Sequence, residues 1–81
     1  MSKLIERTSE VQDAIDACEA VGDFEQAGYL AAPALKKHTG NTLEQMLVVC
    51  DAMLRCDIPQ DYVLRTNGVV RWINEQLEQQ Q

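Results

Sequence analysis

The segment from residue 43 to residue 54 has the apolar spacing of an amphipathic helix, and this spacing constrains the fold more than any other feature of the chain. Its apolar residues recur three, four and seven positions apart: Leu43, Met46, Leu47, Cys50, Met53 and Leu54. Residues at these intervals share one face of an α-helix. Asn41 or Thr42 can begin the helix with a capping box. The helix is expected to end near Arg55, because Pro59 disfavours its continuation.

A second amphipathic helix is predicted from Lys3 to Val21. Its apolar positions alternate spacings of four and three: Leu4, Thr8, Val11, Ile15 and Cys18. Ser2 caps this helix if it starts early, and Ser9 caps it if it starts late. Gly22 suits the left-handed residue after a helix, and Asp23 suits the cap of the next one. The two residues therefore predict a tight turn between helices.

The next helix, over residues 24–38, contains a proline. Inside a helix the ring of Pro33 would clash with the carbonyl of Tyr29, and it disfavours helical geometry at Ala32. The segment closes with three side chains that suit the negative end of a helix dipole: Lys36, Lys37 and His38. The sequence therefore predicts a helix that is broken or kinked at Pro33.

The last region, residues 59–79, can form one helix or two. Its apolar residues would line one face of a single long helix. Asn67 and Gly68, however, both lower helix propensity and favour a turn. We therefore prefer a short helix over residues 59–65 and a second over residues 68–79, with one continuous helix as the alternative.

The chain is short enough that all its helices must share one core. A domain typically has about 100–150 residues, so the 81 residues form a single helical domain, 1–81. The polar tail, residues 78–81, is expected to fray. No segment alternates apolar and polar residues with the period of a strand. The predicted fold is all-α, a compact bundle of four to five short helices.

The sequence holds no pattern typical of catalysis or of metal binding. It has one histidine, His38, and three cysteines at 18, 50 and 56, whereas structural zinc needs four ligands in short pairs. Six residues separate Cys50 from Cys56, so on one helix these two would face different ways. Glycine-rich phosphate loops and hydrolase motifs are also missing. We expect no cofactor, no metal and no enzymatic activity.

The expected compartment is the cytoplasm. No stretch is apolar enough for a membrane-spanning helix, and the first residues turn charged too soon for a signal peptide. The odd number of cysteines argues against a disulfide framework, and Cys18 and Cys50 fall on apolar helix faces, as buried reduced thiols do. We therefore expect no contact with a membrane.

The negative charge of the chain is concentrated near its start. The formal net charge is −6, and residues 1–25 hold seven acids against two bases. Four of these acids fall opposite the apolar positions of the first helix: Glu6, Glu10, Asp13 and Asp16. Such a face is either a solvated surface that keeps the chain soluble, or a docking surface for a basic partner.

A second candidate surface lies near the C-terminus. Arg71 adjoins Trp72, the one tryptophan, and Trp and Arg are enriched at interface hot spots. Trp72 can equally close the small core. If part of it stays exposed, the region suits a partner or a homodimer.

A helix-turn-helix is the remaining alternative, built from residues 42–56 and 59–65. Its second helix would offer Gln60, Asp61 and Arg65 to DNA, beside an acidic flank that phosphates would repel. The balance of charge therefore argues against direct contact with nucleic acid.

These observations together predict a non-catalytic protein that binds another protein. Its partner would carry a basic surface, such as one that binds nucleic acid, and its role would be that of a regulator or inhibitor of a larger macromolecular machine. Phage- or plasmid-encoded inhibitors of host systems, including anti-CRISPR proteins, share this size and charge, and the analogy rests on those two properties alone. The alternatives are a structural or adaptor subunit that forms a homo-oligomer, and a DNA-binding regulator.

Overall fold

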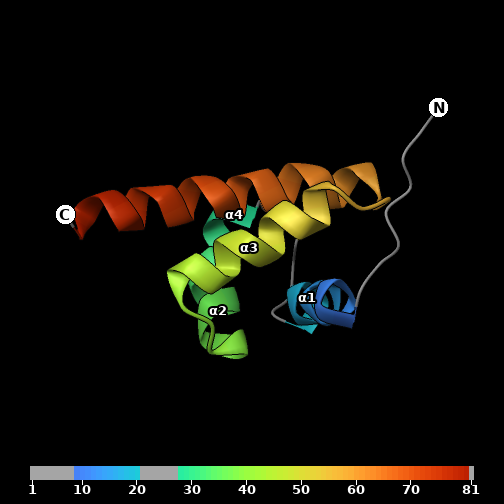
Figure 1. The fold of residues 1–81 in the computed structure, drawn as a ribbon, viewed down its shortest axis with the longest axis horizontal. Helices are drawn as coiled ribbons and strands as arrows, with labels where there is room; N and C mark the ends of the chain where they lie inside the picture. Colours follow the sequence, from blue (N-terminus) through green and yellow to red (C-terminus); the bar gives the residue numbers. More distant parts are fainter. Residues whose placement is uncertain (1–8, 21–27, 81) are drawn as a thin grey trace.

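Four α-helices make up the part of the chain that the computed structural model describes, residues 9–20 and 28–80 (Figure 1). In chain order they are α1 Ser9–Ala20, α2 Gly28–Thr39, α3 Leu43–Leu54 and α4 Gln60–Gln79. The longest helix, α4, lies along the long axis of the molecule, with α2 and α3 packed against it. α1 packs against α3 and α2. The prediction of an all-α fold is confirmed.

α3 begins with the predicted capping box, at Thr42. The backbone N–H of Gln45 donates to Thr42 Oγ1 over 3.1 Å, and the backbone N–H of Thr42 donates to Gln45 Oε1 over 2.8 Å. The helix ends at Leu54, one residue before the predicted end. Its buried residues follow the predicted spacing: Leu43, Met46, Cys50 and Met53. Local signals were therefore sufficient to place this helix.

α2 runs without a break past Pro33, so the predicted break is wrong. Pro33 is exposed, while Ala32 and Leu35, on either side of it, are buried in the core. Proline removes one backbone hydrogen bond from a helix interior, and the packing of these two neighbours holds the helix together across it. A bend within the continuous helix stays a prediction. Gly40 ends the helix with a φ of 73°, and its N–H donates to the carbonyl of Lys36 over 2.9 Å.

α4 is one continuous helix, so the preferred division at Asn67 and Gly68 is wrong and the alternative holds. Gly68 lies where α4 crosses α2: a Cβ on Gly68 would come within 2.7 Å of the backbone nitrogen of Tyr29. In the same contact, a Cβ on Gly28 would lie 1.7 Å from the carbonyl oxygen of Arg65. Glycine at this crossing lets two backbones approach closely, so tertiary packing outweighs its low helix propensity.

The core consists of two clusters of buried side chains. The larger cluster draws residues from all four helices: Ala17, Cys18, Ala32, Leu35, Leu43, Met46, Cys50, Val69 and Ile73. The smaller cluster joins α1 to α3 through Val11, Ile15 and Met53. Burial of Val11, Ile15 and Cys18 confirms the predicted apolar face of the first helix. The predicted positions Leu4, Thr8, Gly22, Asp23 and Phe24 lie outside the described residues.

Candidate functional site

The exposed face of α1 carries negative charge only. Glu10, Asp13 and Asp16 are exposed, while Val11 and Ile15 on the other side of the helix are buried. The sequence from residue 8 to residue 35 contains six Asp and Glu residues and no Lys or Arg. We call Glu10, Asp13 and Asp16 the acidic face. Glu6, the fourth predicted member, lies outside the described residues.

The carboxylates of the acidic face have few partners within the molecule. Gln12 Nε2 donates a hydrogen bond of 3.0 Å to Asp16 Oδ1 on the helix surface. An ion pair lies elsewhere, at the C-terminal end of α3, where Arg55 Nη2 is 2.5 Å from Asp51 Oδ2. Among the described residues no Lys or Arg forms an ion pair with these three carboxylates, and the acidic face presents its charge to solvent.

Glu19, also on α1, has a different environment from the acidic face. It accepts a hydrogen bond of 2.6 Å from the hydroxyl of Tyr62 and so connects α1 to α4. This hydrogen bond raises the pKa of Tyr62 above its ordinary value, because the bond favours the protonated phenol. No pattern in the sequence predicts this contact, since the two residues are 43 positions apart.

Arg71 and Trp72 lie on α4, and each contacts other residues of the same chain. The Arg71 guanidinium lies over the ring of Tyr29, 4.6 Å from its centroid, in a cation–π contact. The Tyr29 hydroxyl donates to a carboxylate oxygen of Glu75, which raises the pKa of Tyr29. Trp72 is half-buried against the larger core cluster.

The structure does not bring the two predicted surfaces together. Figure 1 shows α1 well away from the C-terminal half of α4, which carries Arg71 and Trp72. The acidic face and this pair therefore lie on different parts of the molecule. The role of Arg71 and Trp72 in binding stays a prediction.

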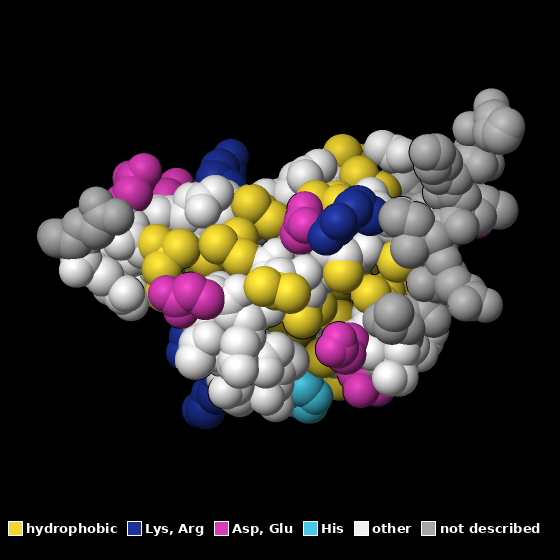
Figure 2. All heavy atoms as spheres, in the orientation of Figure 1, with side chains coloured by type: hydrophobic (Ala, Val, Ile, Leu, Met, Phe, Trp, Pro, Cys, Tyr) yellow, Lys and Arg dark blue, Asp and Glu magenta, His cyan; other side chains and the backbone are white. Residues whose placement is uncertain are grey.

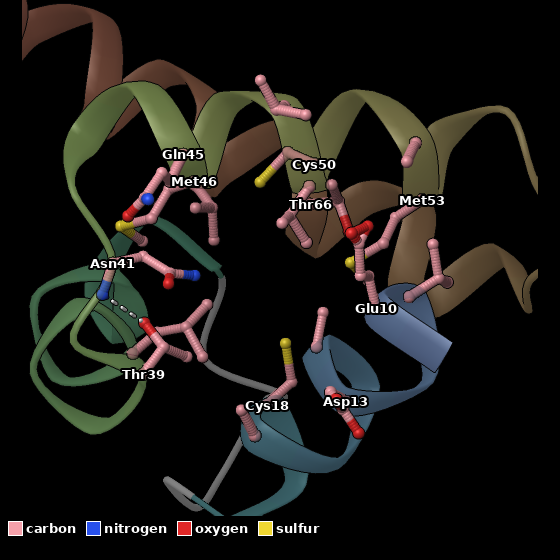
Figure 3. Close-up of a pocket in the computed structure, with 18 of the residues that line it drawn as sticks. Glu10, Asp13, Cys18, Thr39, Asn41, Gln45, Met46, Cys50, Met53 and Thr66 are labelled. Atoms are coloured by element: carbon pink, nitrogen blue, oxygen red, sulfur yellow. Dashed lines mark hydrogen bonds between the residues drawn. The ribbon is translucent and has the colours of Figure 1, made fainter. Parts of the chain in front are cut away.

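A cavity of about 630 Å³ opens between α1, α2 and α3, with α4 at its base (Figure 3). Four sulfur-containing side chains line it: Cys18, Met46, Cys50 and Met53. Glu10 and Asp13 of the acidic face also line it. The sequence does not predict this cavity. Helical periodicity shows which residues turn inward, and it does not show how completely they fill the space between helices.

The two cysteines of the cavity wall are uncharged. Burial raises the pKa of Cys18 to about 11 and that of Cys50 to about 12. Both thiols are therefore protonated at neutral pH and act as small apolar groups, not as nucleophiles or metal ligands. Within the described ranges no three His, Cys, Asp or Glu side chains gather in a way that could hold a metal ion.

Thr66 on α4 is one of several polar residues in a wall that is mainly apolar. Its side chain is 2% exposed, and among the described residues its hydroxyl oxygen has no hydrogen-bond partner. Leaving a buried polar group unpaired costs about 1–3 kcal/mol. The apolar pattern of α4 placed Thr66 on the inward face, but no sequence signal marks its hydroxyl as unpaired.

Comparison with known proteins adds no further guide to the function. No family model matches the chain, and no curated protein or solved structure matches it either. A helix that crosses a bilayer needs about 20 mostly apolar residues, and none of the helices in the described ranges combines that length with that apolar character. The acidic face and the cavity are the two features from which a function can be inferred.

Proposed function

We propose that this chain is a non-catalytic protein-binding regulator that docks through its acidic face onto a basic surface of another protein. The observation that carries the proposal is the single sign of charge on exposed α1: Glu10, Asp13 and Asp16 face outward with no Lys or Arg between residues 8 and 35. The alternative, that the face is acidic only to keep the chain soluble, predicts no loss of partner binding when the charge of the face is reversed.

Electrostatic docking of this kind acts mainly on the rate of association and on the choice of partner. A surface of one sign attracts an oppositely charged surface over several ångströms and accelerates encounter. Because salt screens charges over about 10 Å at 0.1 M, complex formation should weaken as salt rises. The expected partner is a basic protein surface, such as one that binds nucleic acid.

The specific role that we propose is inhibition or regulation of a larger macromolecular machine in the cytoplasm. An acidic helix can occupy a basic groove that would otherwise hold phosphates, and it needs no cofactor to do so. The small size and net charge of −6 resemble those of phage- or plasmid-encoded inhibitors such as anti-CRISPR proteins. That analogy concerns size and net charge alone, and it identifies no target.

A structural subunit that forms a homo-oligomer is the second candidate. Three large apolar side chains are strongly exposed: Leu30 at 67%, Val48 at 69% and Leu64 at 62%. Figure 2 shows hydrophobic side chains spread over the α3 and α4 side of the molecule. Exposed apolar patches mark contact surfaces when they are contiguous. A mass that rises with concentration in light scattering would support this candidate, and a strict monomer would exclude it.

The DNA-binding alternative is the least supported of the three. Its helix pair would be α3 and the start of α4, and the first turn of α4 carries an acid, Asp61. Arg55, which directly follows α3, already forms an ion pair with Asp51. A gel shift at low salt that weakens steeply as salt rises would support it, and the absence of any shift would exclude it.

Charge reversal tests the main proposal. The triple variant Glu10→Lys, Asp13→Lys, Asp16→Lys should lose capture of its partner from a lysate of the native host at low salt, where the wild-type chain retains it. A matched control, Glu44→Lys, Asp61→Lys, Glu78→Lys, changes three other exposed acids and reaches the same net charge. We expect the control to capture the same protein. Equal capture by both variants would mean that the acidic face is not the docking surface.

A further inference from the structure

The mouth of the cavity coincides with the acidic face. Glu10 and Asp13 belong to both, and Val48, which is 69% exposed, lines the cavity from α3. Figure 3 shows Glu10 extending from α1 toward Met53 across the opening. A group that enters the cavity would therefore pass between two carboxylates and an exposed apolar side chain. A segment that combines an apolar group with positive charge is complementary to this mouth.

The walls of the cavity favour an aromatic group over an aliphatic one. In Figure 3 Cys18 on α1 faces Cys50 and Thr66 across the cavity, and the side chains of Met46 and Met53 lie on the α3 side. Thioether sulfur makes favourable contacts with the edges of aromatic rings, and Met adapts its shape to a guest. The volume, about 630 Å³, falls within the range of about 300–1,000 Å³ that is typical of ligand pockets.

The hydroxyl of Thr66 identifies the polar part of the guest. It is 98% buried, since its exposed fraction is 2%, and it has no partner among the described residues. A hydroxyl can accept one hydrogen bond, and because this oxygen has almost no exposed surface, a donor in the cavity reaches it once the Thr66 side chain rotates toward the opening. Trp and Tyr are the side chains that carry a single donor at the end of a large apolar ring. They are also the aromatic residues most enriched at interface hot spots.

We propose that the cavity receives a Trp or Tyr side chain from a basic segment of the partner protein, with the ring against the sulfur-lined wall and its N–H or O–H donated to Thr66 Oγ1. Flanking Lys or Arg residues of that segment lie over Glu10 and Asp13. This proposal rests on the proposed function, because it takes the basic partner from there, and it adds an anchor to the electrostatic contact.

Short dye-labelled peptides test the proposal directly. The first has a central Trp between Lys residues, and two others replace this Trp by Ala or by benzothienylalanine, which keeps the bicyclic ring and lacks the N–H. Affinities for the full chain are measured by fluorescence anisotropy. We expect the Trp peptide to bind about tenfold more tightly than the Ala peptide. It should bind about fivefold more tightly than the benzothienyl peptide, as expected for one hydrogen bond.

Two variants of the chain locate the binding site. Ala14→Leu fills space in the cavity wall and should weaken binding of the Trp peptide about tenfold, whereas Ala34→Leu makes the same change at an exposed position of α2 outside the cavity and should leave binding unchanged. Thr66→Val keeps the shape of the side chain and removes the hydroxyl. In that variant the Trp and benzothienyl peptides should bind equally.

The outcomes separate this proposal from the proposed function. Equal affinity of the Trp and Ala peptides, or equal affinity of wild type and Ala14→Leu for the Trp peptide, overturns the cavity as the anchor site. If Glu10→Gln, Asp13→Asn still weakens the Lys-flanked peptide in that case, the acidic face keeps its role. If Lys-flanked and Glu-flanked Trp peptides bind equally tightly, the proposal that the partner segment is basic is wrong. Free indole that binds as tightly as the Trp peptide overturns a protein segment as the occupant.

Discussion

The two sides of this small bundle are packed in opposite ways. Where α2 crosses α4, the backbones touch, and the glycines at positions 28 and 68 leave no room for a methyl group. Where α1 lies against α2 and α3, a cavity of about 630 Å³ opens to the surface. On both sides the helices have apolar faces that can be recognised in the sequence.

The contrast separates a tightly packed crossing from an open hollow. Protein interiors are normally close-packed, and the α2–α4 side follows that rule: the two backbones touch at Gly28 and Gly68, and Ile73 on α4 is fully buried. The cavity opens to solvent, so it is a hollow in the surface and not a void in the core. The acidic face lies beside this hollow, since Glu10 and Asp13 line it.

The largest expected effect comes from shortening a core residue on each side. Ile73 on α4 is fully buried in the larger cluster, and Ile15 on α1 belongs to the smaller one. Ile→Ala substitutions cost about 2–5 kcal/mol. We expect about 4 kcal/mol for Ile73→Ala and about 2 kcal/mol for Ile15→Ala, measured by urea unfolding. Equal losses would contradict the division between a tight and a loose side.

A second test adds one carbon at the crossing. Gly28→Ala raises helix propensity by about 1 kcal/mol, but its Cβ would lie 1.7 Å from the carbonyl oxygen of Arg65. Overpacking of this kind costs about 1–3 kcal/mol, occasionally more. The net expectation is a loss of about 2 kcal/mol or more in the free energy of unfolding. If the variant were more stable than wild type, the helices would not touch at this point.

The same crossing explains which parts of the fold the sequence could predict. The boundaries of α3 depend on local signals, the Thr42 capping box and a run of regularly spaced apolar residues, and these were predicted closely. The continuity of α4 depends on what Gly68 meets, the backbone of Tyr29, which lies almost forty positions earlier in the chain. Propensity at Asn67 and Gly68 describes the isolated segment and carries no information about that contact.

The candidate site, like the fold, can be predicted from the sequence only in part. The acids of α1 were predicted because charge and helical periodicity are both local properties. The cavity was not, because it depends on the gap between α1 and α3, and the unpaired hydroxyl of Thr66 depends on its distance from groups on several helices. Sequence patterns therefore predict the exposed acids of α1, and they do not predict the cavity beside them.

Alkaline pH should weaken the side that holds the thiols. Burial raises the pKa of Cys50 from its ordinary value of 9.0 to about 12, so the folded chain keeps this thiol protonated where the unfolded chain would ionise it. This contribution to stability is complete below about pH 9 and is lost as the pH rises toward 12, by up to about 1.4 kcal/mol per pH unit.

Urea unfolding of wild type and Cys50→Ala between pH 8 and about pH 11 measures this contribution. Three other groups have a raised pKa in the folded chain and lower the wild-type stability at alkaline pH in the same way: Cys18, Tyr29 and Tyr62. The difference between the two chains isolates Cys50, and we expect the variant to lose less stability above pH 9. Cys56→Ala, at a half-exposed position, is the control. A Cys50→Ala curve parallel to that of wild type would mean that this thiol is open to solvent.

The smallest effect compares two threonines that line the cavity. Thr39 Oγ1 accepts from the backbone N–H of Asn41 over 3.2 Å and donates to the carbonyl of Lys36 over 3.3 Å, whereas Thr66 Oγ1 has no partner among the described residues. Thr66→Val should therefore raise the free energy of unfolding by about 1 kcal/mol, and Thr39→Val should lower it by about 1 kcal/mol. A loss of stability in Thr66→Val would show that its hydroxyl is already hydrogen-bonded in solution. A gain would mean that the folded chain carries a destabilising unpaired hydroxyl beside the cavity.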